Sequence, residues 1–220
     1  MIRAAAASLV LVAVACGGPA ATPSPPAQAE ALAPAPARLR GTLLAGADST
    51  LVFVACGTTT ERPVLAPPSS QLLLAVAAVN GEVRDSLFVE LTADTTGGAI
   101  TAVETLFATS LSEGTRCDRP REPFDVVAIG NEPFWRVTFD GTQLVLERPE
   151  PPREMVFDAD PAETRGALTT IIGRRALGKV HELKLGLLRE SCSDGMSDAW
   201  YPYRAEVRVG DLALHGCARR

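Results

Sequence analysis

The sequence predicts a mainly β protein built from two small antiparallel β-barrel or sandwich domains, the first with one short helix. Short runs of β-type residues recur along the chain, and turn-type clusters separate them. A charged stretch with two prolines, at 119–123, interrupts this pattern. We therefore expect one β domain at 38–118, a linker at 119–123 and a second β domain at 124–220.

The first half contains four predicted strands, at 39–44, 50–56, 87–93 and 100–107. Between the second and third lies a segment rich in Leu and Ala, at 71–79. Ser69 or Ser70 can cap its first amides, and Asn80-Gly81 is a common stop signal. The segment predicts the one helix of this domain, with a buried strand as the alternative.

The second half contains about eight predicted strands and no helix. We expect the strands at 124–129, 134–139, 143–148, 154–157, 168–172, 181–188, 203–209 and 212–217. Asp140-Gly141 and Gly210-Asp211 are typical hairpin turns. A series of this length predicts closure as an antiparallel barrel or sandwich.

The first 15 residues have the pattern of an export signal. Arg3 supplies a positive charge, and 4–15 form an uncharged run that is too short to span a bilayer. Ala13-Val14-Ala15-Cys16 resembles a lipobox, which predicts lipidation of Cys16, although an ordinary signal peptide cut nearby is the alternative. Residues 16–37, mostly Gly, Pro, Ala, Ser and Thr, predict a disordered tether. We expect a lipid-anchored envelope protein on the outer membrane, facing the periplasm.

The cysteine count agrees with export. Of five cysteines, an odd number in an exported chain, lipidation of Cys16 leaves an even set of four. Export would place these in an oxidising compartment, where disulfides persist. Of three possible connectivities, Cys56–Cys117 with Cys192–Cys217 keeps each bridge inside one predicted domain, and we expect that pairing.

Composition argues against several functional classes. The net charge is −5, and no basic face or basic amphipathic helix indicates nucleic acid or a lipid surface, so membrane contact should come through the lipid anchor. His181 and His215 are the only histidines, and no hydrolase, phosphate-loop or zinc-site motif is present. We expect no enzymatic activity, no metal and no cofactor.

Two aromatic clusters, each at the start of a predicted strand, are the candidate binding residues. With their polar neighbours they are Glu132, Phe134, Trp135, Asp194, Met196, Asp198, Tyr201 and Tyr203. Strand alternation puts Phe134 and Trp135 on opposite faces, so one can join the core while the other reaches the surface. The functional hypothesis is a recognition patch at a barrel mouth. The alternative is that the aromatics plug the barrel and the acids cap turns.

The same stretches resemble a known family. Gly-Asn-Glu-Pro-Phe-Trp at 130–135, Cys-Ser-Asp-Gly-Met-Ser-Asp at 192–198 and the closing Gly216-Cys217 are similar to a family of uncharacterised bacterial envelope lipoproteins, over 124–218. The resemblance implies an envelope location and pairing of Cys192 with Cys217. It implies no particular activity.

The first half is similar to the OB-like barrel of envelope-stress lipoproteins of the copper-resistance NlpE type. Gly41-Thr42-Leu43, the run 53–57, the run 87–91 and Cys117 carry this resemblance. The CxxC pair of the metal-associated domain is absent, so the resemblance implies the OB-like shape and no ligands.

Two functional hypotheses follow. The first is a binding or sensing module for a small ligand or an envelope protein, of which a lysozyme inhibitor acting through 193–198 is one version. The second is a structural spacer or assembly lipoprotein. A pocket at the aromatic clusters favours the first, and a sealed barrel end favours the second. A hydrolase would require His181 or His215 beside a Ser or Asp in a cleft.

Overall fold

The computed structural model describes residues 35–45, 50–80, 86–111, 116–176 and 182–220. The chain divides into two units, Met1–Pro34 and Ala35–Arg220, and all described residues belong to the second. The signal, Cys16 and most of the predicted tether therefore lie outside the described residues. Within the described ranges, no helix has the length and apolar character needed to cross a bilayer.

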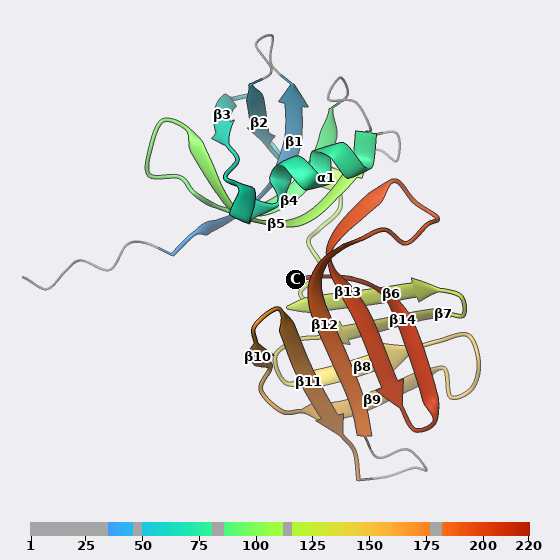
Figure 1. Ribbon diagram of the computed structural model, residues 1–220. Coiled ribbons are helices and arrows are strands. Elements are labelled where there is room, and N and C mark those ends of the chain that lie inside the picture. The colour runs from blue at the N-terminus through green and yellow to red at the C-terminus, as the bar shows by residue number, and fades with distance from the viewer. Residues whose placement is uncertain (1–34, 46–49, 81–85, 112–115, 177–181) are drawn as a thin grey trace, which may run out of the picture. The chain divides into compact units, whose positions relative to one another are not determined.

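The first barrel has five strands and confirms the OB-like prediction (Figure 1). The strands are β1 (Ala37–Ala45), β2 (Leu51–Ala55), β3 (Glu61–Leu65), β4 (Leu87–Asp94) and β5 (Ile100–Ser110). They pair in the order β1-β2-β3-β5-β4, and β4 returns to β1, which closes the sheet. Among the described strands, β3 and β5 form the one parallel pair, and α1 with β4 supplies the long connection that a parallel pair needs.

The predicted helix is confirmed as α1 (Leu72–Asn80), after a short 3₁₀ turn at Pro68–Ser70. The Ser70 hydroxyl accepts a hydrogen bond from the Leu72 amide at 3.3 Å and donates one to the Pro67 carbonyl at 2.6 Å. Strand β3 was missed in the sequence, because its charged residues and Pro63 hide the β pattern. Proline is tolerated there because β3 pairs over few residues on either side.

The second barrel closes eight antiparallel strands. They are β6 (Val126–Asn131), β7 (Phe134–Phe139), β8 (Gln143–Glu147), β9 (Glu154–Ala159), β11 (Leu168–Arg174), β12 (Glu182–Cys192), β13 (Ala199–Val209) and β14 (Leu212–Arg219). Each strand pairs with the next one in this list, and β14 pairs with β6, which closes the barrel. The short β10 (Glu163–Arg165), also missed in the sequence, pairs only with β11.

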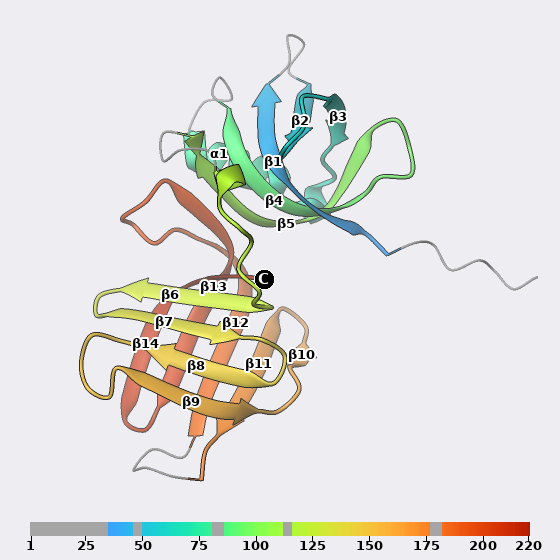
Figure 2. The same cartoon turned by 180° about the vertical axis from the view of Figure 1, so that it is seen from behind.

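Two groups of strands cross at a steep angle to enclose the second barrel's core. Figure 1 shows β11–β14 in front and Figure 2 shows β6–β9 on the opposite side. Inward residues such as Leu144, Leu185 and Val207 are fully buried between them. The hairpins at Asp140-Gly141 and Gly210-Asp211 are confirmed, and both glycines have positive φ, as such turns require.

Strand β13 contributes to both barrels. Most of it pairs with β12 and β14, but Ala199 and Trp200 pair with Thr109 and Ala108 of β5. The Trp200 ring is buried in the first barrel's core. Residues Ala35–Arg220 form one unit, so independent folding of domains divided at 119–123 stays a prediction.

Both expected disulfides are present. Cys56 bonds Cys117, and Cys192 bonds Cys217. The first ties the end of β2 to the 3₁₀ turn at Arg116–Asp118, and the second ties the end of β12 to β14. The mainly β class, the two barrels and the cysteine pairing are thus confirmed, and α1 is the one α-helix among the described residues.

Candidate functional site

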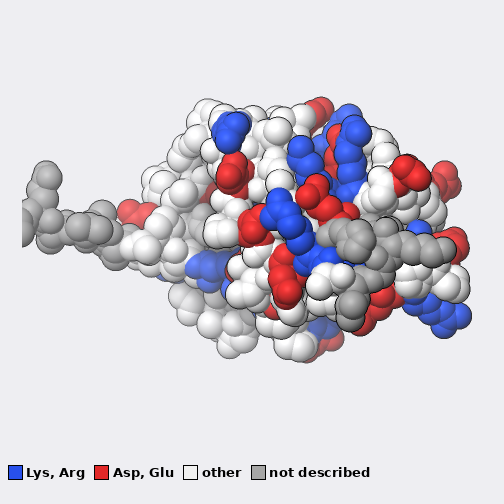
Figure 3. Space-filling view, turned by 90° about the horizontal axis from the view of Figure 1, so that it is seen from below, with Lys and Arg blue, Asp and Glu red and all other residues white. Residues whose placement is uncertain are grey.

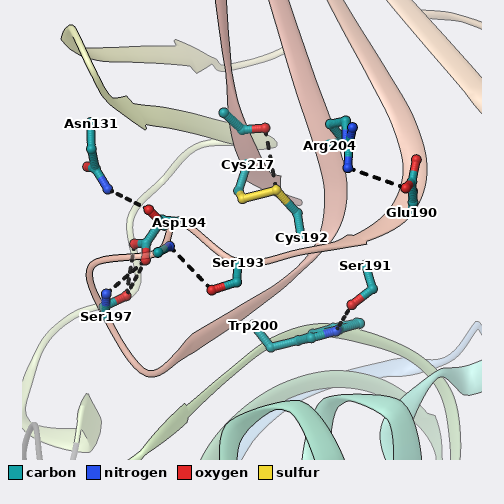
Figure 4. The surroundings of a disulfide bond; sticks show 12 residues. Asn131, Glu190, Ser191, Cys192, Ser193, Asp194, Ser197, Trp200, Arg204 and Cys217 are labelled. Atoms are coloured by element: carbon teal, nitrogen blue, oxygen red, sulfur yellow. Dashed lines mark hydrogen bonds and ion pairs between the residues drawn. A yellow bond between two sulfur atoms is a disulfide. The ribbon is translucent and has the colours of Figure 1, made fainter.

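A groove of about 570 Å³ lies on the second barrel, where both family-like motifs meet. The end of β6, the loop between β12 and β13, and β14 form its walls. Its lining residues are Ile129, Gly130, Asn131, Glu132, Cys192, Ser193, Asp194, Gly195, Met196, Arg204, His215, Gly216 and Cys217. Segments some 60 to 85 positions apart in sequence thus form one surface feature. Figure 4 shows the part of it around the disulfide.

The β6–β7 turn supplies a carboxylate to one wall of the groove. Asn131 pairs with Phe134 across a two-residue turn made of Glu132 and Pro133, whose peptide bond is cis. Glu132 is exposed. Among the described residues it has no hydrogen-bond or ion-pair partner, so its carboxylate is available to a ligand.

The 193–198 loop is held in shape by Asp194. One carboxylate oxygen of Asp194 accepts hydrogen bonds from the amides of Met196 and Ser197, at 3.1 and 2.9 Å, and both oxygens accept from the Ser197 hydroxyl. The Asn131 amide donates to the Asp194 carbonyl at 3.0 Å, which fastens the loop to β6 (Figure 4). Asp194 therefore has the turn-capping role that the sequence offered as the alternative.

Two glycines let the paired strands β6 and β14 approach closely beneath the groove. A Cβ atom on Gly216 would lie 1.9 Å from the Ile129 carbonyl oxygen, and one on Gly130 would lie 2.1 Å from Nε1 of Trp135. The Trp135 ring packs against both glycines and is buried. The Cys192–Cys217 bridge lines the groove beside it. This wall is therefore made of close-packed backbone, a disulfide and an indole.

The rim carries charges of both signs and one exposed apolar side chain. Arg204 lies 3.4 Å from Glu190, and both side chains are largely exposed, so the pair contributes little stability and can be displaced by a ligand. His215 is exposed on β14. Met196, at the loop tip, is 77% exposed. The groove can therefore offer hydrogen bonds, a carboxylate, a guanidinium, an imidazole and a flexible thioether contact.

The structure separates the eight predicted binding residues into two sets. Glu132, Asp194 and Met196 line the groove. Trp135, Tyr201 and Tyr203 are buried in the hydrophobic cores, whereas Phe134 is 58% exposed away from the groove. The predicted opposite facing of Phe134 and Trp135 is confirmed, and a patch containing all the aromatics is not formed.

Two of the candidates that do not line the groove, Tyr203 and Asp198, make polar contacts toward the first barrel. The Tyr203 hydroxyl donates to Glu104 at 2.8 Å. Burial, and then the hydrogen bond to Glu104, raises the pKa of Tyr203. Ser110 donates to Asp198 at 3.3 Å. Tyr203 and Asp198 therefore link β13 and its preceding loop to β5, and neither lines the groove.

Four polar residues of the groove were missed in the sequence: Asn131, Ser193, Arg204 and His215. Asn131 and Ser193 lie inside the motifs at 130–135 and 192–198. Their position next to Glu132 and Asp194 could have identified them as groove residues. Arg204 and His215 reach the groove only through the β12–β13–β14 register. No local pattern marks them.

The groove brings together a serine, a histidine and two carboxylates among the described residues. Over the residues that the structure describes, no group of three His, Cys, Asp or Glu side chains could hold a metal ion. Ser193 and His215 both line the groove, but the Ser193 hydroxyl accepts a hydrogen bond from the Gly195 amide at 3.3 Å, and none joins it to His215. His181 lies outside the described residues.

Comparison with known proteins gives no match to a family model, to a curated protein or to a solved structure. The resemblances to envelope lipoproteins stay expectations.

Proposed function

We propose that the chain is an exported, lipid-anchored envelope protein whose second barrel binds a ligand or protein partner in the groove between β6, the 193–198 loop and β14. The groove itself carries this proposal, because it has an ordered loop, an available carboxylate at Glu132 and an exposed Met196. The two disulfides support an oxidising compartment. Anchoring through Cys16 rests on the lipobox-like sequence.

The alternatives have less support. A spacer needs no groove, whereas this chain holds the groove's loop in place with at least four hydrogen bonds. A lysozyme inhibitor acting through 193–198 would need the Asp194 and Asp198 carboxylates, which accept hydrogen bonds within the chain. On the face shown in Figure 3, acidic and basic side chains are interspersed, which agrees with the expectation that nucleic acid is not the partner.

Photo-crosslinking in the producing cell tests the proposed binding surface. A photoreactive amino acid replaces Met196 at the groove, and a matched control replaces Lys184, which is exposed on β12 of the same barrel. We expect a discrete adduct at position 196 and none at 184. Glu132→Lys in the 196-labelled chain should weaken the adduct, because it reverses the available charge of the groove.

Two outcomes would contradict binding at the groove. Equal adducts at both positions would indicate random collision, and no adduct at position 196 would leave the groove without an occupant. Circular dichroism of each variant shows that the barrels are intact, so a negative result cannot come from misfolding.

A further inference from the structure

Helix α1 is made of apolar residues from Leu72 to Val79. Its sequence, Leu-Leu-Leu-Ala-Val-Ala-Ala-Val-Asn, has no charged residue, and neither its first nor its last turn carries one. The inner face, formed by Leu72, Ala75 and Val76, is buried in the first barrel's core. A helix of this composition is normally covered on all sides.

The outer face of α1 is nevertheless exposed. Leu73 and Leu74 are 56% and 58% exposed, and Ala77 and Ala78, one turn further along, are exposed as well. Among surface segments, a contiguous face of four apolar side chains without a polar residue is typical of a contact surface. Transfer of this face into an apolar environment would not require the desolvation of any charged side chain.

The proposed anchor decides which apolar environment this face meets. About 21 residues separate Cys16 from Ala37, so a fully extended connection reaches about 70 Å at most. If Cys16 is acylated, the start of β1 at Ala37 stays within this distance of the bilayer, and α1 belongs to the folded unit that begins there. Tethering at such a distance raises the effective concentration of the membrane surface, and a weakly apolar face is then sufficient for docking.

We propose that the outer face of α1, formed by Leu73, Leu74, Ala77 and Ala78, docks on the phospholipid bilayer to which the chain is anchored. The proposal rests on the anchored state in the proposed function, and it goes beyond groove binding because it assigns a second contact surface on the first barrel. The helix lies in the plane of the interface with its outer side chains at the acyl boundary. It does not span the membrane.

Quenching of a fluorophore on α1 tests docking directly. A chain from Gly17 onward, with an amino-terminal hexahistidine in place of the lipid, is bound to vesicles of phosphatidylethanolamine, phosphatidylglycerol and a nickel-chelating lipid. An environment-sensitive probe is attached at Ala78→Cys, with the exposed Lys184→Cys as the matched control position. Since an interfacial helix is immersed about 5–10 Å, a lipid-borne quencher should quench position 78 about threefold more than position 184.

A charge variant gives the second readout. Leu73→Glu with Leu74→Glu should reduce lipid quenching at position 78 to the control level, whereas Leu168→Glu, at a similarly exposed leucine of the second barrel, should leave it unchanged. Equal lipid quenching at positions 78 and 184 would overturn docking. Docking would also be overturned if position 78 were protected from both lipid and aqueous quenchers while light scattering showed a dimer. A second copy of the chain would then cover the face.

This design separates failure of docking from failure of the anchor. The nickel lipid holds the chain at the vesicle whether or not Cys16 is acylated in the cell. The mass of the chain from the envelope reports the anchor separately.

Discussion

Replacement of Trp200 by Ala should remove a large part of the stability of the described unit. The ring belongs to β13, yet it is buried to 1% exposure in the first barrel's core. A buried indole removes up to about 200 Å² from water, which at about 25 cal/mol per Å² amounts to about 5 kcal/mol. Compactness of the unfolded chain lowers this to about 4 kcal/mol, within the range measured for large aromatic truncations. Its hydrogen-bond partner Ser191 is exposed, so water replaces the lost bond.

Urea unfolding followed by far-ultraviolet circular dichroism, with disulfides intact, measures the effect. With a slope of about 2 kcal/mol per M, the midpoint should fall by about 2 M. Phe134→Ala removes an aromatic ring that is 58% exposed and should cost less than about 1 kcal/mol. A loss below about 1 kcal/mol for Trp200→Ala would refute the reasoning, because the first barrel would then not depend on a side chain from β13.

Three further predictions concern the walls of the groove and a hairpin. Gly216→Ala should destabilise by about 2 kcal/mol in the same assay, because its methyl group meets a backbone carbonyl at 1.9 Å. Gly186→Ala, with its nearest neighbour at 3.8 Å, should be tolerated. Equal effects of the two substitutions would contradict the close approach of β6 and β14 at Gly216. Replacing Cys192 and Cys217 by Ala opens a bridge of sequence separation 25 and should lower the free energy of unfolding by about 3.5 kcal/mol; an unchanged midpoint would mean that the bridge constrains nothing. The pKa of Asp140 is lowered by hydrogen bonds from the backbone amides of Thr142 and Gln143 and from the Thr142 hydroxyl. The contribution of the Asp140 carboxylate to folding stability is therefore present above its unfolded pKa and is lost as pH falls through the folded pKa. Asp140→Asn should therefore be less stable than wild type at pH 7, by less than about 1 kcal/mol, and the difference should vanish in acid titration; a difference independent of pH would exclude this cause.

The sequence contained enough information for most of the fold. Strand alternation and turn residues are local, so they located the two hairpins and most strands. The apolar run with Ser70 before it located α1. Strands β3 and β10 were missed because they are short and polar, and their pairing partners, rather than their residues, make them strands.

The candidate site was predicted only in part, for a physical reason. The motifs at 130–135 and 192–198 marked two walls of the groove, and Glu132, Asp194 and Met196 were identified there. Alternation could not tell which face of each strand points inward, so the buried Trp135 and Tyr203 were included. The role of β13 in both barrels depends on pairing between distant segments, which no local pattern encodes.

We propose that the chain works as an exported, anchored protein with oxidised cysteines. Intact mass of the chain extracted from the membrane fraction, with and without reduction, tests this most directly. We expect a chain that begins at Cys16, carries added acyl mass and gains four hydrogens on reduction. A chain without acyl mass, or one whose mass does not change on reduction, would contradict it.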